Sequence, residues 1–543
     1  MQKHKYFSLI IVSTFLIAIS LPLIGSFMQD DRGLSYQEKR KLQQLPQLPH
    51  QLEELDEYIT AFEKYFNDQF GFRDFFLSSY SHIKGLIGDR DISRNAENVG
   101  TANVLEGKDG WFFLNRKWDG DPVADYRNLD LYSEGKLLLA TLLFAARTHW
   151  LKSQGVEYVF FFAPNKHTIY SEYLPDYIRK EGDISALDQL DDALRRHTDV
   201  NFVDLRPTLL QSKDEAVKYW KDSKEEAALY YKMDSHWNSG GADIAQFAIA
   251  ERISHLFPGR IIPAKRPLED FIIRRFVGDI TLIMGGNEKE AYGPALMQGT
   301  CTPLSFMDYL QRHHVTECPR GQLDAIVFND SFLPPLKPYF SDYFRRTVYR
   351  WEQMQEAVVA REMQVRKPDI VIEQRAERFL PFYPRADYAF YEGFWEKHWS
   401  KWKLVFALDL EKAAEGAYRN SNLEMQFRKE RGDLLLKATS DDPMLYLPKM
   451  EMQPDTLYLG RAVLESEHDT ELQIFYSVAG AEEQFPSDES HISFSLQKGM
   501  NVLYMPLFSM NMAGRIRIDP ARKPGKYELQ ELQVRELGWV DLR

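Results

Sequence analysis

The stretch AIVFNDSF, residues 325–332, is the part of this sequence that says most about the fold. Its first four residues form a short apolar run, which predicts a strand buried inside a parallel sheet. The run stops abruptly at three small polar residues, and a strand that ends in this way can expose a nucleophile on a sharp turn. Asp330 is expected to hold that turn by accepting backbone N–H groups. Ser331 is therefore the first candidate for a reactive group.

The stretch DSHW, residues 234–237, supplies the partners that such a serine needs. An aspartate that orients a histidine, which in turn deprotonates a serine, is the minimum apparatus for acyl transfer through an acyl-serine. Asp234 and His236 lie two residues apart, so their side chains can point the same way on an extended segment. An Asp-x-His pair is a weak signal when it occurs alone. Together with the serine turn it predicts a site made of Asp234, His236 and Ser331.

Length and composition limit the class of protein. A chain of 543 residues is too long for one compact core and should divide into two or three units. With 44% hydrophobic and 27% charged residues, wholesale disorder is excluded. The formal net charge of -13 argues against a nucleic-acid partner, because phosphate binding requires a basic surface.

The N-terminal residues predict the location of the protein. Lys3 and Lys5 precede an apolar run that extends to about residue 28, close to the ~20 residues that cross a bilayer. We therefore expect a signal anchor at residues 1–28, with the remainder in the bacterial periplasm and attached to the inner membrane. A cleaved signal peptide, which would release the protein into the periplasm, is the alternative. The polar residues 29–54, which include two prolines, are expected to form a stalk.

The remaining chain predicts two architectures. Helical patterns at 134–154 and 242–257 alternate with apolar strands at 156–162 and 325–328, which indicates an α/β layered domain over residues 55–400. A helical lead-in is expected at 55–86. Short alternating segments separated by turn residues follow, and they predict an all-β sandwich over residues 401–543. Cys301 and Cys318, the two cysteines of the chain, could close a disulfide loop or remain free thiols.

Several of these motifs resemble the AlgX/AlgJ-like alginate O-acetyltransferase family, a permuted branch of the SGNH hydrolase-like superfamily. The resemblance covers roughly residues 60–390, and histidine precedes serine as in that branch. Asn329 stands where the family has glycine, and asparagine tolerates a left-handed backbone, so the turn can be kept. The matching segments are Asp234–Asn238 with Gly241-Ala242, Asp330–Phe332, Pro164–Lys166 with Tyr170, Gly278–Ile280, and Glu373 with Glu377-Arg378.

The resemblance implies an exported O-acetyltransferase that acts on a polysaccharide through an acyl group on Ser331. It also implies an acetyl donor supplied across the membrane by a separate membrane-bound O-acyltransferase. The C-terminal unit resembles a jelly-roll carbohydrate-binding module, and a purely structural β-domain is the alternative reading. An acetyl esterase would use the same residues with water as acceptor, and a non-catalytic glycan-binding assembly protein is a third hypothesis.

The rest of the site is less sharply defined by sequence. The oxyanion hole should combine the Ser331 backbone N–H with a second donor, for which Asn165 is a candidate because of its place after a strand. Lys166 could hold a substrate carboxylate, although a surface salt bridge explains it equally well. Asn329 and Tyr339 complete the candidate oxyanion and substrate-binding group. No cofactor is expected, and no metal, since the histidine pair at 313–314 lacks companions at metal-ligand spacing.

Overall fold

The computed structural model describes residues 20, 34–35, 40–41, 43–49, 55–71, 92–93, 102–220, 227–286, 291–296, 301, 313–415, 419–478, 491–508 and 512–543. The expected anchor at 1–28 lies outside these residues except for Ser20, and so does most of the expected stalk. No helix among the described residues is both long and apolar enough to cross a bilayer. The lead-in region contains α2 (Leu55–Asp68), and its expected continuation from 72 to 86 lies outside the described residues.

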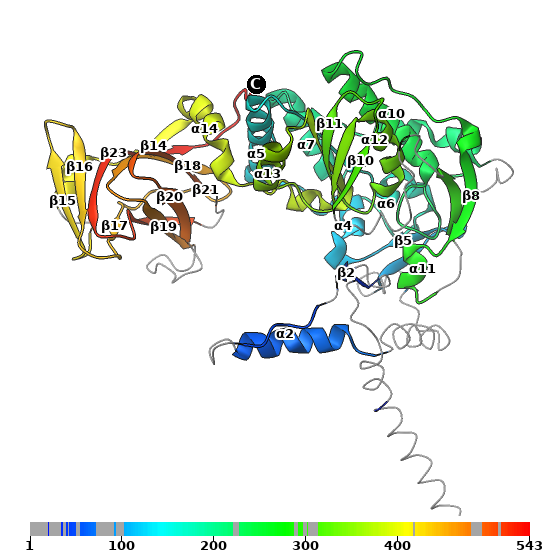
Figure 1. Ribbon diagram of the computed structural model, residues 1–543, viewed down its shortest axis with the longest axis horizontal. Coiled ribbons are helices and arrows are strands. Elements are labelled where there is room, and N and C mark those ends of the chain that lie inside the picture. Colours follow the sequence, from blue (N-terminus) through cyan, green and yellow to red (C-terminus); the bar gives the residue numbers. More distant parts are fainter. Residues whose placement is uncertain are drawn as a thin grey trace, which may run out of the picture.

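A six-stranded, mostly parallel sheet forms the centre of the first unit (Figure 1). Three neighbouring strands in its middle, β11, β13 and β6, run parallel, so their carboxyl ends meet at one edge. The edge strand β10 is antiparallel to β12. The strands in spatial order are β10 (His313–Glu317), β12 (Arg346–Arg350), β11 (Asp324–Phe328), β13 (Ile370–Ala376), β6 (Glu157–Ala163) and β7 (Asn201–Phe202).

Both faces of this sheet are covered by helices. Side chains of β6 alternate between two apolar clusters: Phe161 points into the cluster on one face, and Phe160 into the cluster on the other. The first cluster contains side chains of α10 (Ser239–Leu256) and α12 (Lys337–Tyr343). The second contains side chains of α5 (Glu134–Ser153), α7 (Ala186–His197) and α13 (Glu356–Val365). Burial on both faces explains why β6 and β11 are continuously apolar in sequence.

Capping residues fix where two of these helices begin. The Ser133 side chain accepts a hydrogen bond from the N–H of Lys136 at the start of α5. The Asn238 side chain accepts from Gly240 N at 2.9 Å and Gly241 N at 3.1 Å. Helix α10 therefore begins at Ser239, three residues before the expected start, because the glycines belong to its first turn.

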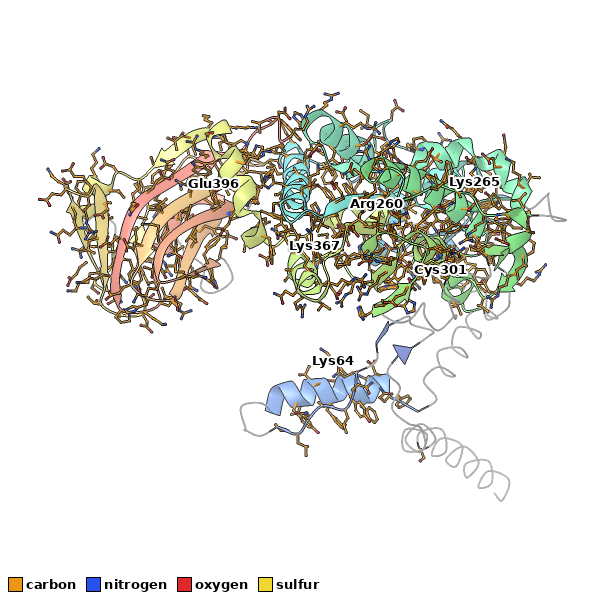
Figure 2. The ribbon with its side chains drawn as sticks, turned by 45° about the horizontal axis from the view of Figure 1, so that its top comes forward. Lys64, Arg260, Lys265, Cys301, Lys367 and Glu396 are labelled. Atoms are coloured by element: carbon orange, nitrogen blue, oxygen red, sulfur yellow. A yellow bond between two sulfur atoms is a disulfide. The ribbon has the colours of Figure 1, made fainter. Side chains whose placement is uncertain are left out.

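The C-terminal region is β-rich, as predicted, with two antiparallel sheets enclosing a third apolar cluster. The larger sheet consists of β15 (Leu423–Arg428), β16 (Asp433–Ala438), β23 (Gly525–Glu536), β18 (Tyr458–Ser466) and β21 (Gly499–Leu507), with β14 (Lys403–Ala407) also paired to β23. The smaller sheet consists of β17 (Leu445–Tyr446), β22 (Met512–Asp519), β19 (Thr470–Val478) and β20 (His491–Leu496). The architecture changes just before β14, after the short helix α14 (Glu392–His398), which carries Glu396 at the junction (Figure 2).

The two units pack against each other. Leu459 of β18 and Leu542, near the C-terminus, belong to the same apolar cluster as the helices α5 and α7. Asp455 accepts hydrogen bonds at the start of α5, from Ser133 Oγ at 2.6 Å and Gly135 N at 3.1 Å. The C-terminal residues return to α7, where Leu542 N donates to the carbonyl of the last helical residue at 2.8 Å (Figure 1). The β-rich unit therefore covers apolar surface of the α/β unit.

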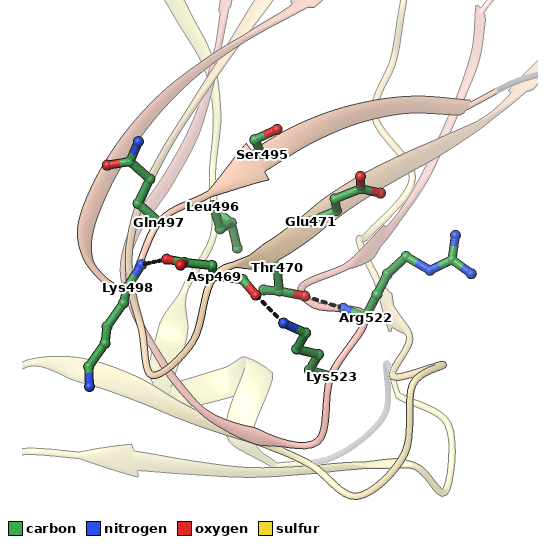
Figure 3. Close-up of a pocket in the computed structure, with 9 residues that line it drawn as sticks. All are labelled: Asp469, Thr470, Glu471, Ser495, Leu496, Gln497, Lys498, Arg522 and Lys523. Atoms are coloured by element: carbon green, nitrogen blue, oxygen red, sulfur yellow. Dashed lines mark hydrogen bonds between the residues drawn. The ribbon is translucent and has the colours of Figure 1, made fainter.

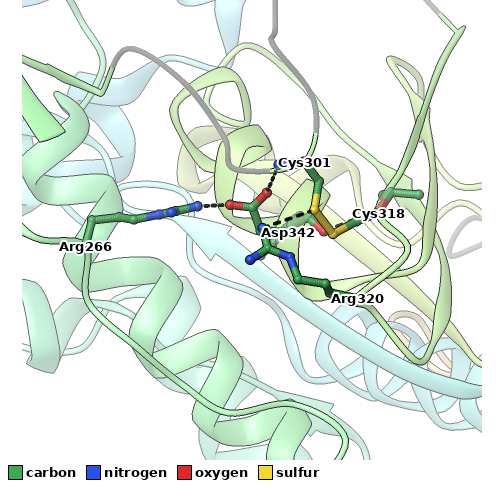
Figure 4. The surroundings of a disulfide bond; sticks show 7 residues. Arg266, Cys301, Cys318, Arg320 and Asp342 are labelled. Atoms are coloured by element: carbon green, nitrogen blue, oxygen red, sulfur yellow. Dashed lines mark hydrogen bonds and ion pairs between the residues drawn. A yellow bond between two sulfur atoms is a disulfide. The ribbon is translucent and has the colours of Figure 1, made fainter.

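A disulfide joins Cys301 to Cys318, immediately before β11 (Figure 4). Asp342 lies beside it, accepting a hydrogen bond from Cys301 N at 2.9 Å and pairing with Arg266. Arg266 lies 76 residues before Asp342 in the chain, so the contact ties the disulfide region to a distant segment. The pairing settles which of the two states expected for the cysteines is present.

A hollow of about 740 Å³ opens at one end of the β-rich unit, where strand turns meet (Figure 3). Its lining is mostly polar and charged: Asp469, Thr470, Glu471, Ser495, Leu496, Gln497, Lys498, Arg522 and Lys523. Asp469 holds the turns together, since its side chain accepts from Lys498 N at 2.8 Å and its carbonyl from Lys523 Nζ at 2.7 Å.

Candidate active site

The candidate residues gather at the carboxyl edge of the central sheet. Ser331 follows β11, Lys166 follows β6, and Glu377 follows β13, which lies between those two strands. Chemistry in open α/β sheets collects at this edge because the loops after neighbouring strands converge there. The loop that carries His236 precedes α10 and reaches the same edge, where it meets Ser331.

Asp234, His236 and Ser331 form a continuous hydrogen-bonded chain. His236 Nδ1 lies 2.7 Å from Asp234 Oδ1, and His236 Nε2 lies 2.8 Å from Ser331 Oγ. The two contacts use opposite nitrogens of one imidazole, so a carboxylate that fixes the Nδ1–H tautomer leaves Nε2 free to accept the serine proton. Asp234 is buried, whereas His236 and Ser331 are partly exposed. The geometry is that of a serine nucleophile with its base and the carboxylate that orients the base.

The turn that presents Ser331 is held by its neighbour Asp330. Asp330 Oδ1 accepts from Phe332 N at 3.0 Å and from Gln374 Nε2 at 2.8 Å, and Oδ2 accepts from Ala376 N at 2.6 Å. Two of these partners belong to β13, so the carboxylate joins the serine turn to the neighbouring strand. The turn-holding role expected for Asp330 is present.

A further carboxylate, Asp279, stands beside the histidine and was not among the predicted site residues. Its backbone N–H donates to Asp234 Oδ2 at 2.8 Å. Its side chain accepts from Ser235 N at 2.7 Å and Ser235 Oγ at 2.5 Å, and Oδ2 lies 3.5 Å from His236 Nδ1. Asp279 therefore positions both residues of the Asp-His pair. Its match to the Gly-Asp segment of the resembling family was the one sequence signal for it.

Lys166 is buried beneath the Asp-His segment, with 2% of its surface exposed. Its ammonium donates to three backbone carbonyls: Tyr231 at 3.0 Å, Lys232 at 3.1 Å and Asp234 at 2.8 Å. Burial lowers the pKa of Lys166 to about 7, and the nearby carboxylates of Asp279 and Asp234 oppose that shift. These contacts are neither the substrate contact nor the surface salt bridge expected from sequence, because the side chain points under the loop.

Asn165 lies next to this lysine and is also buried. Its backbone N–H donates to Glu377 Oε2 at 2.7 Å, and its side-chain amide donates to Asp125 Oδ2 at 2.8 Å. Burial raises the pKa of the Asp125 carboxyl well above its usual value, and nearby Glu377 raises it further. An amide carries two N–H hydrogens, so Asn165 retains a second N–H beside the one that Asp125 accepts. The backbone N–H of Ser331 has no acceptor among the described residues. That the two donors serve one oxyanion stays a prediction.

The two remaining candidates, Asn329 and Tyr339, are also buried. The Asn329 side chain donates to the carbonyls of Val327 at 3.2 Å and Arg350 at 2.9 Å, so it secures the end of β11. Tyr339 lies on α12 with 2% of its surface exposed, in the apolar cluster of that face, and its ring lies 5.6 Å from the Arg266 guanidinium. Among the described residues, no hydrogen bond or ring contact joins Tyr339 to Ser331 or His236. A direct substrate contact by either residue stays a prediction.

Aromatic side chains shield the imidazole on one side. The ring of Phe332 lies 4.6 Å from the His236 ring, and Trp237 Nε1 donates to the Phe332 carbonyl at 2.9 Å. Both aromatic residues are fully buried. A drier environment strengthens the hydrogen bonds of the charged groups it surrounds.

Within the described part of the chain, two groups of side chains have donor atoms close enough together for a metal ion. One consists of Asp234, His236 and Asp279, with donor atoms within 4.8 Å of one another. Its members already hydrogen-bond to one another and to Ser235, and this accounts for their proximity. The other group includes Cys301 and Cys318, whose sulfurs are joined in the disulfide and do not offer thiolates.

The segment of the chain that contributes Asp234 and His236 is similar to an SGNH hydrolase-like domain. Residues 104–318 match the family model of the SGNH hydrolase-like domain of the acetyltransferase AlgX, which confirms the expected resemblance. The matched segment contains Asp234, His236 and Lys166. Ser331 lies beyond its end and is joined to it by the hydrogen bond from His236.

Solved structures were also compared. Bacillus cereus PatB1 is 17% identical and aligns over 50% of this chain and 95% of its own, with a TM-score of 0.35. The O-acetyltransferase domain of Pseudomonas putida AlgJ is 16% identical over 55% and 99%, with a TM-score of 0.32. Pseudomonas aeruginosa AlgX is 15% identical over 80% and 95%, with a TM-score of 0.34. No curated protein matches the sequence.

Proposed function

We propose that this chain is an O-acetyltransferase that adds acetyl groups to an exported or cell-surface polysaccharide through an acetyl-Ser331 intermediate. The observation that carries the proposal is the position of His236, 2.7 Å from Asp234 and 2.8 Å from Ser331. The match of residues 104–318 to an acetyltransferase domain supports acetyl as the transferred group.

The first half of the reaction loads the serine. His236 Nε2 takes the proton of Ser331 Oγ as this oxygen attacks the carbonyl carbon of the donor acetyl ester. The oxyanion of the tetrahedral intermediate accepts hydrogen bonds from the Ser331 N–H and the Asn165 amide. The donor alcohol then leaves with the proton from His236, and the acetyl group remains on Ser331.

The second half transfers the acetyl group to sugar. A hydroxyl of the polysaccharide gives its proton to His236 and attacks the acetyl-serine carbonyl. Collapse of the second tetrahedral intermediate returns the proton to Ser331 Oγ and releases the acetylated sugar. Asp234 keeps the imidazole in the required tautomer and stabilises its positive charge in both halves.

The location and the donor follow from the N-terminal sequence and the family resemblance. A periplasmic protein attached to the inner membrane, through residues 1–28, would meet an acetyl donor delivered by a membrane-bound O-acyltransferase. The C-terminal β-rich unit would then bind the polymer as a carbohydrate-binding module. Expression of the full chain, followed by membrane fractionation and N-terminal sequencing, would separate an uncleaved anchor from a cleaved signal peptide.

An acetyl esterase would use the same three residues with water in place of sugar. Purified protein, given an aryl acetate and an oligosaccharide, distinguishes the two when acetylated oligosaccharide and free acetate are both measured. We expect acetylated sugar to exceed free acetate, and Ser331→Ala to form neither. Acetate alone, at every acceptor concentration, would assign the chain as an esterase. Normal acetylation of cell-surface polysaccharide by Ser331→Ala would point instead to a non-catalytic assembly protein.

A further inference from the structure

The loop between β5 (Phe112–Leu114) and α4 (Pro122–Tyr126) presents an exposed indole. Trp118, in the short 3-10 helix Lys117–Asp119, has 74% of its surface exposed. Tryptophan is buried on average in folded proteins, because burial of its large apolar ring is favourable. An indole left in solvent on a well-held loop contributes little to folding and is suited to bind a ligand.

The loop that carries this indole is held in one conformation. The Arg116 carbonyl accepts two backbone N–H groups, from Asp119 at 3.1 Å and Asp121 at 3.2 Å. The Asp121 side chain caps α4 by accepting from Ala124 N at 3.1 Å. These contacts fix the backbone on both sides of Trp118. The ring is therefore presented by a rigid turn and does not need to be ordered when a ligand arrives.

A cation stacks against the ring and limits its movement further. The Arg116 guanidinium lies 4.7 Å from the centroid of the Trp118 ring, within the range of a cation–π interaction. Since one face of the indole is occupied in this way while most of the side chain stays exposed, the opposite face is open to a flat apolar partner.

The loop is anchored beside the nucleophile. Asp119 Oδ1 lies 3.5 Å from Arg378 Nε, and the Arg378 guanidinium lies 5.8 Å from the ring of Phe332, the residue after Ser331. The backbones also touch, because a Cβ at Gly120 would lie 2.5 Å from the Arg378 carbonyl oxygen. Arg378 follows β13 by two residues, and β13 holds the serine turn through Asp330. The loop that carries Trp118 is thus linked, through Arg378, to the residue that follows Ser331.

We propose that Trp118 is the platform on which a sugar ring of the acceptor polysaccharide stacks while a hydroxyl of the same polymer reaches Ser331. The C–H face of a pyranose ring is flat and apolar and matches the open face of an indole. This inference rests on the proposed function, since it names the residue that would hold the polymer during transfer. It predicts that the loop contributes to acceptor binding and contributes nothing to the chemistry on small esters.

The test measures Trp118→Ala with two substrates. The first is an aryl acetate without acceptor, and the second is the same ester with an oligosaccharide acceptor of six sugar units. We expect unchanged aryl acetate hydrolysis and a rise of about tenfold in the acceptor KM, the loss expected for one stacked ring. Trp118→Tyr should recover most of the affinity because it keeps an aromatic face. Val365→Ala, at an 80% exposed apolar position on α13, is the matched control and should change neither rate.

Two outcomes would overturn the platform. One is an unchanged acceptor KM in Trp118→Ala, and the other is an equal loss in ester hydrolysis and transfer, which would make the indole a support of the fold. Neutral and uronate oligosaccharides are tested side by side as acceptors. If Trp118→Ala changes the KM of neither acceptor, the proposal is overturned.

A binding measurement separates this proposal from the proposed function. Calorimetric titration of the same oligosaccharides into Ser331→Ala protein requires no catalysis. If the protein proves to be an esterase, weaker binding in the Ser331→Ala, Trp118→Ala double variant still supports the platform. Equal binding by the two proteins rejects it whatever the reaction is.

Discussion

The ammonium of Lys166 lies 2.8 Å from the backbone carbonyl oxygen of Asp234. This contact joins the end of β6 to the segment that carries the histidine, and two further carbonyls of the same segment share the ammonium. A positive charge is thereby placed between two carboxylates, Asp234 and Asp279, that both act on His236. Lys166 is a positioning residue whose charge and geometry can be tested separately.

Replacing Lys166 with methionine should flatten the pH dependence of kcat/KM for an aryl acetate around pH 7. Burial lowers the pKa of Lys166 to about 7, so its ammonium loses its charge in this range beside the segment that carries His236. A pH profile between 5 and 9 measures the difference between wild type and variant. Lys232→Met is the matched control, since that side chain is on the surface and donates to a distant loop carbonyl. If Lys166→Met lowers kcat/KM by the same factor at every pH, Lys166 is only a structural support.

Lys166 should also make the free energy of unfolding depend on pH. Its pKa is lowered to about 7 in the folded protein and returns to its ordinary value near 10.5 on unfolding. Between these values the unfolded chain binds more protons, so the free energy of unfolding should rise with pH through this residue. Denaturant unfolding at pH 7, 8 and 9 should show wild type gaining on Lys166→Met as pH increases. A constant difference across that range would contradict the lowered pKa.

A fluorophosphonate probe should label the protein at Ser331. The reaction requires the serine oxygen to be activated by the imidazole 2.8 Å away. Labelling should be lost in Ser331→Ala and should fall strongly in His236→Ala, as measured by intact mass and peptide mapping. Equal labelling of the His236→Ala protein would show that the histidine does not activate this serine.

Asp234→Asn should lower the rate strongly and leave the fold intact. The amide disturbs the histidine tautomer, and the comparable change in serine proteases costs about 10⁴ in kcat. Asp279→Asn should cost less, because Asp279 holds Asp234 through its backbone N–H and approaches His236 Nδ1 only to 3.5 Å. Circular dichroism verifies folding of both variants. Similar losses of rate in Asp234→Asn and Asp279→Asn would mean that both carboxylates orient His236.

Deleting the residues after 402 should destabilise the α/β unit. The β-rich unit covers an apolar cluster through Leu459 and Leu542, and Asp455 caps the start of α5. We therefore expect the truncated protein to lose aryl acetate hydrolysis together with polymer transfer, and to unfold at a lower denaturant concentration.

Arg522→Ala, in the hollow of Figure 3, leaves that packing intact. It tests polymer binding by this unit in the full chain.

Local sequence signals predicted a large part of the fold. The apolar runs that became β6 and β11 are buried on both faces, and Ser133 caps α5, so pattern and structure agree there. The longest strand, β23, was not predicted. Its alternation of buried Tyr527 and Leu529 changes phase before Leu532, where the register with β18 shifts, and the period of two is broken at that point.

The candidate site was predictable only where chemistry lies in short motifs. The Asp-x-His segment and the serine turn identified three side chains that the structure brings into hydrogen-bond contact. The cradle of Lys166 consists of backbone carbonyls, which carry no sequence signature. Asp279 meets Asp234 across 45 residues through a backbone N–H, a contact that depends on the tertiary fold. Trp118 lies in a different loop again, and only the fold links that loop to the residue that follows Ser331.

The hydrogen bond from Ala376 N to Asp330 Oδ2 has a consequence for the order in which the site forms during folding. Asp330 and Ala376, which form this hydrogen bond, are 46 residues apart in the chain. Ser331 and His236 are 95 residues apart. Contacts of this span form late, because the chain between them must first lose its freedom. We therefore expect a newly made chain to carry an inert serine until β13 has docked between β11 and β6. Reactivity toward esters would then indicate that folding is complete, and incompletely folded molecules would not hydrolyse the acetyl donor.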